Sequence, residues 1–409
     1  MTLPSAEEIR KGHGRLTYQE AMSLMPLSDK TADDGSVVRR YMSKRRAYPL
    51  GTQLVPLARE MGIENWDMGP GAYGGHVYSQ ASVAAFLTFR AARKVAGNGG
   101  KDKKFAIHTI HGFFPEAGQT DRPFIYEVKP LGSNALFPNF LVTARQPTSP
   151  STNPEGDHYP EADASLPLGL VCFTAMVSFR PHSFSQFIAQ ESSPQARFAE
   201  ILNSRRPRDW DPAPITDIEG VMAAIPSARR AIGTFPGLDM RKVDMREYNA
   251  GRPIHERREL ILYRLLAPLS GTTTTTAGEE LEGEGRCAIA ISGPDAHISA
   301  HAFAADRNGL LMIGHHAGFG REFARAATLS YSFVVHVNAE DAVMTYAEDG
   351  ESEWWVQEAC FPRIEAGRGI IHTKIWSPRG VHVATEYQDG IVRRTPRPED
   401  AEKEVKGKL

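Results

Sequence analysis

The sequence predicts an α+β fold in which one arrangement, a helix followed by antiparallel strands, occurs twice. Three observations predict it: apolar residues recur at helical spacing over residues 77–95, strand-like runs follow that stretch, and a comparable order of elements returns in the second half. The 409 residues are 41% hydrophobic and 23% charged, an ordinary globular composition that can bury more than one core. The repeated order is typical of an internal duplication.

The net charge, the apolar runs and the cysteine content of the chain argue against several classes of binding partner and of site. The formal net charge is −2, so neither nucleic acid nor an anionic membrane surface is predicted as a partner. No apolar run approaches the roughly 18 residues of a spanning helix, so we expect no membrane insertion. The charged N-terminus lacks an apolar stretch, so we expect an intracellular, soluble protein without a secretory signal. Cys172, Cys287 and Cys360 are too few and too far apart for a disulfide framework or a metal knuckle.

The helix of the first repeat is predicted from a stripe of small residues that follows the permissive pair Gly74-Gly75. Small side chains at this spacing allow another element to approach the helix closely. The stripe consists of Val77, Ala81, Ala84, Thr88, Ala91 and Val95, and strand-like runs follow at residues 105–114, 124–131, 136–144 and 170–179.

The second repeat is predicted from shorter segments. Strand-like residues 261–266 open it, strand-like residues 298–304 lead into Asp306, and a short helical segment is expected at residues 310–313. Further strands are predicted at residues 328–337, 342–348, 354–361, 370–376 and 381–388, with a turn at Pro378-Arg379-Gly380 between the last two.

Stretches without apolar periodicity divide the chain. Two of them lie between strand-like runs and are expected to be long excursions from hairpins, and a third, rich in proline, is expected to connect the repeats. We therefore predict an N-terminal repeat (1–180, insertion near 147–167), a connecting segment (181–235), a C-terminal repeat that carries the catalytic residues (236–395, insertion near 270–286) and an exposed tail (396–409).

A long central helix with small-residue packing, wrapped by a curved antiparallel sheet, is the hot-dog architecture, so the duplicated pattern predicts a double hot-dog fold. The chain also resembles the type II acyl-CoA thioesterases over roughly residues 60–395. Residues 74–80 resemble that family's Gly-Gly-Gln-x-x-x-Gln helix opening, and residues 108–114 and 122–128 its His-Ser-x-His-x-Tyr-Phe and Pro-Ile-x-Tyr-x-Val strands; residues 173–179, 304–308, 327–333 and 388–393 fall on other matching stretches.

The resemblance implies an acyl-CoA thioesterase, which hydrolyses a fatty or fatty-like acyl-CoA to the free acid and CoA. It further implies that Asp306, Thr328 and Gln388 hold and activate a water molecule, with Asp306 as the general base and with no metal or cofactor. Backbone N–H groups near Asn308 and Gly309 are expected to stabilise the oxyanion.

The residues themselves support this assignment in part. Asp306 is expected where a strand gives way to a helical segment, a position at which the helix dipole favours a carboxylate. Strict alternation places Thr328 on the polar face of its strand, opposite Leu329 and Tyr331. Gln388 is expected to end its strand on the side of Ala384 and Glu386. Only the shared fold, and not the sequence, brings the three together.

Comparison of the two repeats predicts a single active site in each chain. The alignment places an apolar residue near Ile107 opposite Thr328, and Val177 opposite Gln388. Two departures from the family pattern also remove positive charge: Pro115-Glu116-Ala117 replaces Leu-Arg-Pro, and Phe140-Leu141-Val142 stands where a basic pair usually precedes valine. These departures affect the conventional CoA-phosphate contacts or the usual substrate preference.

Two other functions stay open at this point. A hot-dog enoyl-CoA hydratase is suggested by Asp306-Arg307-Asn308, which matches the first half of Asp-x-Asn-Pro-x-His; Gly309 then replaces the proline, and Met312 or nearby apolar residues replace the histidine. A non-catalytic acyl-CoA-binding protein is suggested by the lost basic residues. The histidines His108, His111, His315 and His316 lack the carboxylate or cysteine spacing of a metal site.

The sequence also gives expectations about assembly and location. Hot-dog sheets commonly join edge to edge, so we expect a homo-oligomer. The terminal Gly407-Lys408-Leu409 resembles the Ser-Lys-Leu address that a peroxisomal import receptor reads. We therefore expect a peroxisomal protein, with the cytosol as the alternative.

Overall fold

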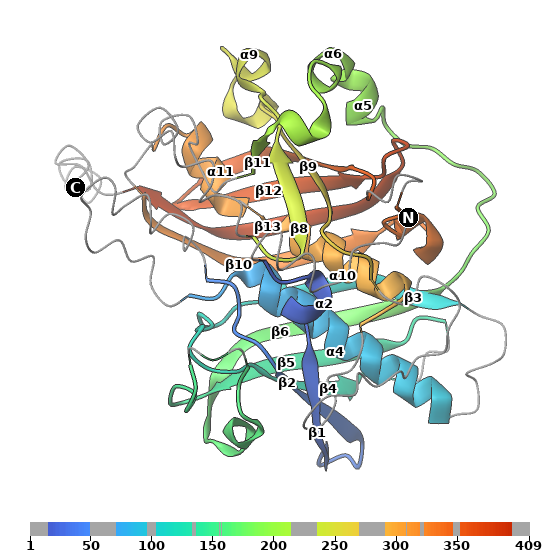
Figure 1. Ribbon diagram of the computed structural model, residues 1–409, viewed down its shortest axis with the longest axis vertical. Helices are drawn as coiled ribbons and strands as arrows, with labels where there is room; N and C mark the ends of the chain where they lie inside the picture. Colours follow the sequence, from blue (N-terminus) through green and yellow to red (C-terminus); the bar gives the residue numbers. More distant parts are fainter. Residues whose placement is uncertain are drawn as a thin grey trace, which may run out of the picture.

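The computed structural model describes residues 15–49, 71–95, 104–132, 136–154, 156, 158–213, 235–269, 291–307, 309–319, 323–346 and 352–394. The strands form one sheet in the order β1-β2-β4-β5-β6-β3-β10-β13-β12-β11-β9-β8-β7, and all its ladders are antiparallel. Two central helices, α4 (Gly74–Val95) and α10 (Pro294–Ala305), pack against each other and against this sheet (Figure 1). The expected insertion at residues 270–286 and the tail 396–409 lie outside the described residues.

The N-terminal repeat consists of α4 and six strands. These are β1 (Leu24–Thr31), β2 (Val37–Ser43), β3 (Phe105–Phe113), β4 (Ile125–Pro130), β5 (Asn139–Pro147) and β6 (Leu168–Pro181). The face of α4 that carries Ser79 and Ser82 packs on α10, where Ser82 Oγ lies 2.7 Å from Ser299 Oγ. The predicted stripe of small residues lies on the opposite face of α4 and packs on the sheet, where Thr88 Oγ1 lies 3.2 Å from the Tyr41 hydroxyl of β2. Strands β1 and β2 were not predicted from the sequence.

The C-terminal repeat consists of α10, α11 (Gly309–His316) and seven strands. These are β7 (Asp211–Pro212), β8 (Leu238–Lys242), β9 (Glu259–Leu265), β10 (Phe323–Val335), β11 (Trp355–Glu365), β12 (Arg368–Trp376) and β13 (His382–Arg394). Strand β10 pairs with β3 of the first repeat, from Ser330 opposite Phe113 to Val334 opposite Thr109. The two repeats therefore share one sheet, and the predicted double hot-dog fold is confirmed.

Strands β7 and β8 of the second repeat were not predicted from the sequence, and two further segments differ from the prediction. Residues 298–304 are helical and belong to α10, because this helix is buried on every side and therefore shows no apolar stripe. The strand predicted at residues 342–348 is also wrong over the part that the structure describes: the 3₁₀ helix η6 (Ala339–Ala342) occupies its start, and Tyr346 makes only an isolated bridge to Ser352.

Short helices cover the outer face of the C-terminal sheet. The described part of the connecting segment contains α5 (Pro194–Arg197), α6 (Ala199–Asn203) and η4 (Pro207–Asp209), and α9 (Arg246–Asn249) and η5 (Ile254–Glu256) follow β8. Phe198 and Trp210 pack there against Leu260 and Trp376, in a cluster separate from the main core. The remaining short helices are α2 (Tyr18–Ala21) and η3 (Glu161–Ser165). None of the described helices is long and apolar enough to cross a membrane.

Candidate active site

Asp306 lies between the two repeats, at the C-terminal end of α10 and beside the N-terminus of α4. The Gly75 N–H donates to Asp306 Oδ2 at 2.5 Å. The first N–H groups of a helix have no partner within that helix, so the start of α4 is suited to hold a carboxylate. The helix N-terminus seen to bind Asp306 is therefore that of the first repeat, whereas the sequence led us to expect it just downstream of Asp306 itself.

The glycine pair at the start of α4 permits this close approach. A Cβ at Gly74 would lie 3.1 Å from Asp306 Oδ2, and a Cβ at Gly75 would lie 2.7 Å from the Tyr73 ring. Tyr73 cannot move away easily, because its hydroxyl donates to the Phe303 carbonyl at 2.7 Å and the residue is buried. Tyr73 and Gly75 thus fix the end of α4 against the end of α10, a role that the sequence did not assign to them.

Gln388 connects the other two residues of the predicted set. Its Nε2 donates to Asp306 Oδ1 at 2.5 Å and to Thr328 Oγ1 at 2.7 Å. The structure thus brings Asp306, Thr328 and Gln388 together, although they come from a helix end and two strands. Gln388 lies in the middle of β13 and does not end its strand as expected. Its Oε1 is buried and has no partner within the described residues.

Thr328 reaches this cluster because of an irregularity in β10. Thr328 pairs with Gly390 and Ser330 with Asp389, so two residues of β10 advance against one of β13. Such a β-bulge interrupts the alternation of side chains. Thr328 consequently lies on the helix-facing side together with Tyr331, whose hydroxyl donates to the Ala302 carbonyl at 3.0 Å. The prediction that Thr328 and Tyr331 occupy opposite faces is wrong for this reason.

Burial sets the protonation of Asp306. The residue is 8% exposed, and its removal from water raises the carboxyl pKa from 3.8 to about 7, against the hydrogen bonds from Gly75 and Gln388, which lower it. A carboxylate with a pKa near neutrality is the stronger base and still ionises at physiological pH. The site is therefore suited to take a proton from a bound water molecule.

A second buried carboxyl group, that of Glu386, lies on β13, the strand that also carries Gln388. Glu386 is fully buried, faces the same side of β13 as Gln388, and pairs in register with Thr373 of β12. Burial raises its pKa well above the ordinary value, so we assign it the neutral form. Its two-residue spacing from Gln388 was visible in the sequence, but nothing there distinguished it from a solvated glutamate.

The corresponding positions of the first repeat are apolar. In the ladder between β3 and β6, Ile107 pairs with Phe179 and Thr109 with Ser178, the same irregularity as between β10 and β13. This register places Ile107 at the position of Thr328, and Val177 at that of Gln388, as the alignment of the repeats predicted. Both apolar side chains are buried.

The four histidines that were considered for a metal site, and judged to lack its spacing, do not gather at one place. His108 and His111 lie on β3, where His111 Nδ1 is 3.0 Å from Ser332 Oγ, while His315 and His316 end α11. His316 Nε2 lies 2.8 Å from Glu259 Oε1. Over the described ranges, no group of three or more His, Cys, Asp or Glu side chains has the arrangement of a metal site.

Solved structures with a similar arrangement are known. An acyl-CoA thioesterase II TesB2 from Mycobacterium marinum is 16% identical, with 93% of this chain and 98% of that chain covered and a TM-score of 0.48. A tesB protein from Mycobacterium avium subs paratuberculosis is 14% identical, with 87% and 93% covered and a TM-score of 0.46. A conserved protein of unknown function with a hot dog fold from Alicyclobacillus acidocaldarius is 13% identical, with 93% and 98% covered and a TM-score of 0.48. No protein-family model and no curated protein matches the chain. At these identities the likeness concerns the fold alone.

Proposed function

We propose that the chain is an acyl-CoA thioesterase that hydrolyses fatty or fatty-like acyl-CoA to the free acid and CoA. The observation that carries the proposal is the contact set of Asp306: one carboxylate oxygen accepts from the N-terminus of α4, and the other accepts from Gln388, which also binds Thr328. Neighbouring structures named as thioesterases are consistent with it at the level of the fold.

In the proposed reaction, a water molecule held at Asp306, Thr328 and Gln388 attacks the thioester carbonyl carbon. Asp306 accepts the proton of the water as the new C–O bond forms. The tetrahedral intermediate then expels the sulfur, and the proton on Asp306 passes to the departing thiolate to give CoA and the acid. Among the described residues, the candidate donor to the oxyanion is the backbone N–H of Gly309. This residue lies at the start of α11, beside Gln388. Asn308, expected to share this role, lies outside the described residues.

The surroundings of Asp306 argue against the hydratase alternative. Hydration of an enoyl thioester by the motif considered above needs a histidine beside the carboxylate. In the described part of the chain, no histidine nitrogen forms a hydrogen bond or ion pair with Asp306. His76 directly follows Gly75, the residue that donates to Asp306. The His76 ring is fully buried, and this burial lowers the pKa of His76 to about 3. That ring is therefore neutral and unsuited to donate a proton at neutral pH.

Release of CoA thiol tests the proposal directly. Purified protein is incubated with a panel of acyl-CoA substrates from short to long chains, and the free thiol is measured with a chromogenic reagent. A thioesterase releases thiol; a hydratase changes enoyl absorbance without releasing thiol, and a non-catalytic binder changes neither. Absence of thiol release over the whole panel would refute the proposed function.

Location and assembly extend the proposal. We propose that the C-terminal tripeptide directs the protein to the peroxisome, with the cytosol as the alternative. We further propose a homo-oligomer, because the sheet ends in two edge strands, β1 and β7, that can pair with another copy.

A further inference from the structure

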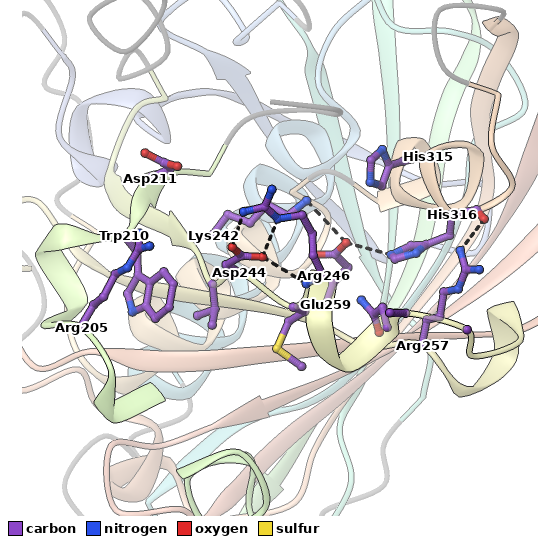
Figure 2. Close-up of a pocket in the computed structure, with 15 residues that line it drawn as sticks. Arg205, Trp210, Asp211, Lys242, Asp244, Arg246, Arg257, Glu259, His315 and His316 are labelled. Atoms are coloured by element: carbon purple, nitrogen blue, oxygen red, sulfur yellow. Dashed lines mark hydrogen bonds and ion pairs between the residues drawn. The ribbon is translucent and has the colours of Figure 1, made fainter. Parts of the chain in front are cut away.

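A pocket of about 480 Å³ lies at the C-terminal end of α11, the end away from Asp306, between α9, β8 and the start of β9 (Figure 2). Its volume is in the range of small-molecule sites. Four cationic side chains line it, against three carboxylates, Asp211, Asp244 and Glu259. The cationic residues are Arg205, Lys242, Arg246 and Arg257. The pocket is therefore positive in balance even before its two histidines are protonated.

Internal ion pairs account for two of the carboxylates. Asp244 receives both forks of Arg246, at 2.9 and 2.6 Å. Glu259 Oε1 lies 3.5 Å from Lys242 Nζ and 2.8 Å from His316 Nε2 (Figure 2). These pairs neutralise part of the wall and leave other cations for a ligand.

Arg205 and Arg257 form no hydrogen bond or salt bridge with a carboxylate among the described residues, although Arg205 lies near enough to Asp244 to help lower the pKa of that carboxyl. The Arg205 guanidinium lies 4.9 Å from the centroid of the Trp210 ring. Arg257 donates only to two backbone carbonyls, that of Arg252 at 2.8 Å and that of His316 at 2.9 Å. Because a guanidinium binds phosphate oxygens with two parallel hydrogen bonds, this pair favours a phosphorylated ligand.

Two buried atoms of the pocket wall also lack partners. Trp210 Nε1 has no acceptor and Glu259 Oε2 has no donor in the described structure, although both residues are only 3% exposed. Buried polar atoms of this kind are normally paired. A suitable ligand would therefore offer both a hydrogen-bond donor and an acceptor besides its phosphate, as a nucleotide does.

Helix α11 links this pocket to the candidate active site. Gly309, at one end, packs against Gln388, and His316, at the other end, contacts Glu259. Eight residues at 1.5 Å each give a length of about 12 Å. The arm of CoA between sulfur and phosphorus has about 13 bonds, or roughly 15 Å when extended at the reach of a polypeptide backbone. Leu311 and His315, the partly exposed residues of α11, lie on one face between the two ends.

We propose that this pocket binds the phosphate-bearing nucleotide end of CoA, while the acyl thioester lies at Asp306 at the other end of α11. The inference rests on the proposed function for the identity of the carrier. It assigns to Arg205 and Arg257 the phosphate contacts, and to Trp210 and Glu259 the hydrogen bonds of the nucleoside.

The test compares a pocket variant with a matched surface variant on two substrates. Arg205→Glu reverses a pocket charge, and Arg208→Glu reverses an exposed charge of the same segment that does not line the pocket. The substrates are an acyl-CoA and the corresponding acyl N-acetylcysteamine thioester, which has no phosphate or nucleoside. Arg205→Glu should raise KM for acyl-CoA about 10-fold or more and leave kcat/KM for the short thioester within about 2-fold. Arg208→Glu should change neither.

Calorimetry with free CoA separates this inference from the proposed function. Wild-type protein should bind CoA, and both Arg205→Glu and the milder Arg205→Gln should bind it at least about 10-fold more weakly with unchanged melting. CoA binding that depends on Arg205, without any thioester hydrolysis, would refute the function and retain the pocket. Hydrolysis with equal KM in wild type and Arg205→Glu would refute the pocket alone. Activation of short-thioester hydrolysis by free ADP would also overturn the inference, because the pocket would then be an effector site.

Discussion

Replacement of Asp306 by asparagine tests the candidate base, because the change keeps the size of the side chain and removes its ability to take a proton. In the wild type, kcat/KM should fall about 10-fold per pH unit below about 7, where burial places the pKa of Asp306. At pH about 8, Asp306→Asn should lower kcat by about 10²–10⁴-fold, the contribution expected of a positioned base. The residual rate should no longer follow this titration.

The same change should stabilise the fold at alkaline pH. Folding raises the pKa of Asp306 from 3.8 to about 7, and three units at about 1.4 kcal/mol each correspond to about 4 kcal/mol. Because the folded pKa is the higher one, the neutral carboxyl is tolerated below pH about 4, and stability is lost as pH rises through about 7. Asparagine carries no charge, so the variant should avoid this loss. Gln388 can meet the new amide by turning its unpartnered Oε1 toward it.

Urea unfolding at pH 5 and pH 8, together with thiol release over the same range, measures both effects. The difference in unfolding free energy between Asp306→Asn and wild type should be larger at pH 8, by about 1–4 kcal/mol. Asp389→Asn is the matched control, since Asp389 follows Gln388 but lies partly exposed near Arg368, 3.9 Å away. A near-normal rate in Asp306→Asn with normal unfolding would remove Asp306 from the mechanism. A stability difference that is the same at both pH values would contradict the raised pKa.

Four further outcomes are expected. Thr328→Val and Gln388→Ala should each slow turnover about 10-fold or more, and the double variant should lose less than the product of the two, because both act on one water molecule. Gly75→Ala should lower kcat/KM, since its Cβ would meet a buried ring at 2.7 Å, whereas Gly71→Ala, with nothing within 4 Å, should not; equal rates would separate the glycine from the site. Light scattering at micromolar concentration should give a multiple of 45.1 kDa, and a mass near that of one chain would contradict the oligomer. Deletion of residues 408–409 should disperse a punctate fluorescent fusion, and an intact fusion that is already diffuse would contradict the peroxisomal address.

The elements with a one-sided pattern could be predicted from the sequence. Helix α4 was predicted because its small residues recur at helical spacing, and most strands were predicted within a few residues of their bounds. Helix α10 could not be recognised, because all of its residues except Pro294 are buried and no polar face alternates with an apolar one. The face on which Thr328 lies was predicted wrongly for another reason. The β-bulge depends on how β10 pairs with β13, and the sequence of one strand does not determine that pairing.

The site itself was predicted only as three positions. Their proximity depends on long-range packing, since Asp306 and Gln388 are 82 residues apart and Gly75 is 231 residues from Asp306. The sequence identified Gly74-Gly75 as a conformationally permissive pair before a helix. It did not show that the Gly75 N–H would donate to a carboxylate of the other repeat. The protonation state of Asp306 could not be predicted from the sequence either, because its raised pKa follows from burial between the two repeats.

In the antiparallel packing of the two central helices, both repeats contribute to the proposed site. The C-terminus of a helix is its negative end, so Asp306 at the end of α10 is disfavoured as an anion both by burial and by its own helix. The positive N-terminus of α4 faces it and offers the Gly75 N–H. A single hot-dog repeat would leave this carboxylate without that partner.

The opposite end of the helix pair lacks the residue set of the proposed site. There the start of α10 carries Asp295, whose Oδ2 binds Arg90 Nη2 at 2.9 Å and whose Oδ1 accepts from the Ile107 N–H at 2.9 Å. A salt bridge to Arg90 and a hydrogen bond from the backbone thus tie this carboxylate into the structure. The neighbouring positions that match Thr328 and Gln388 are Ile107 and Val177, which cannot hold a water molecule. The duplicated fold therefore builds two similar ends, and among the described residues only the Asp306 end carries the side chains of the proposed reaction.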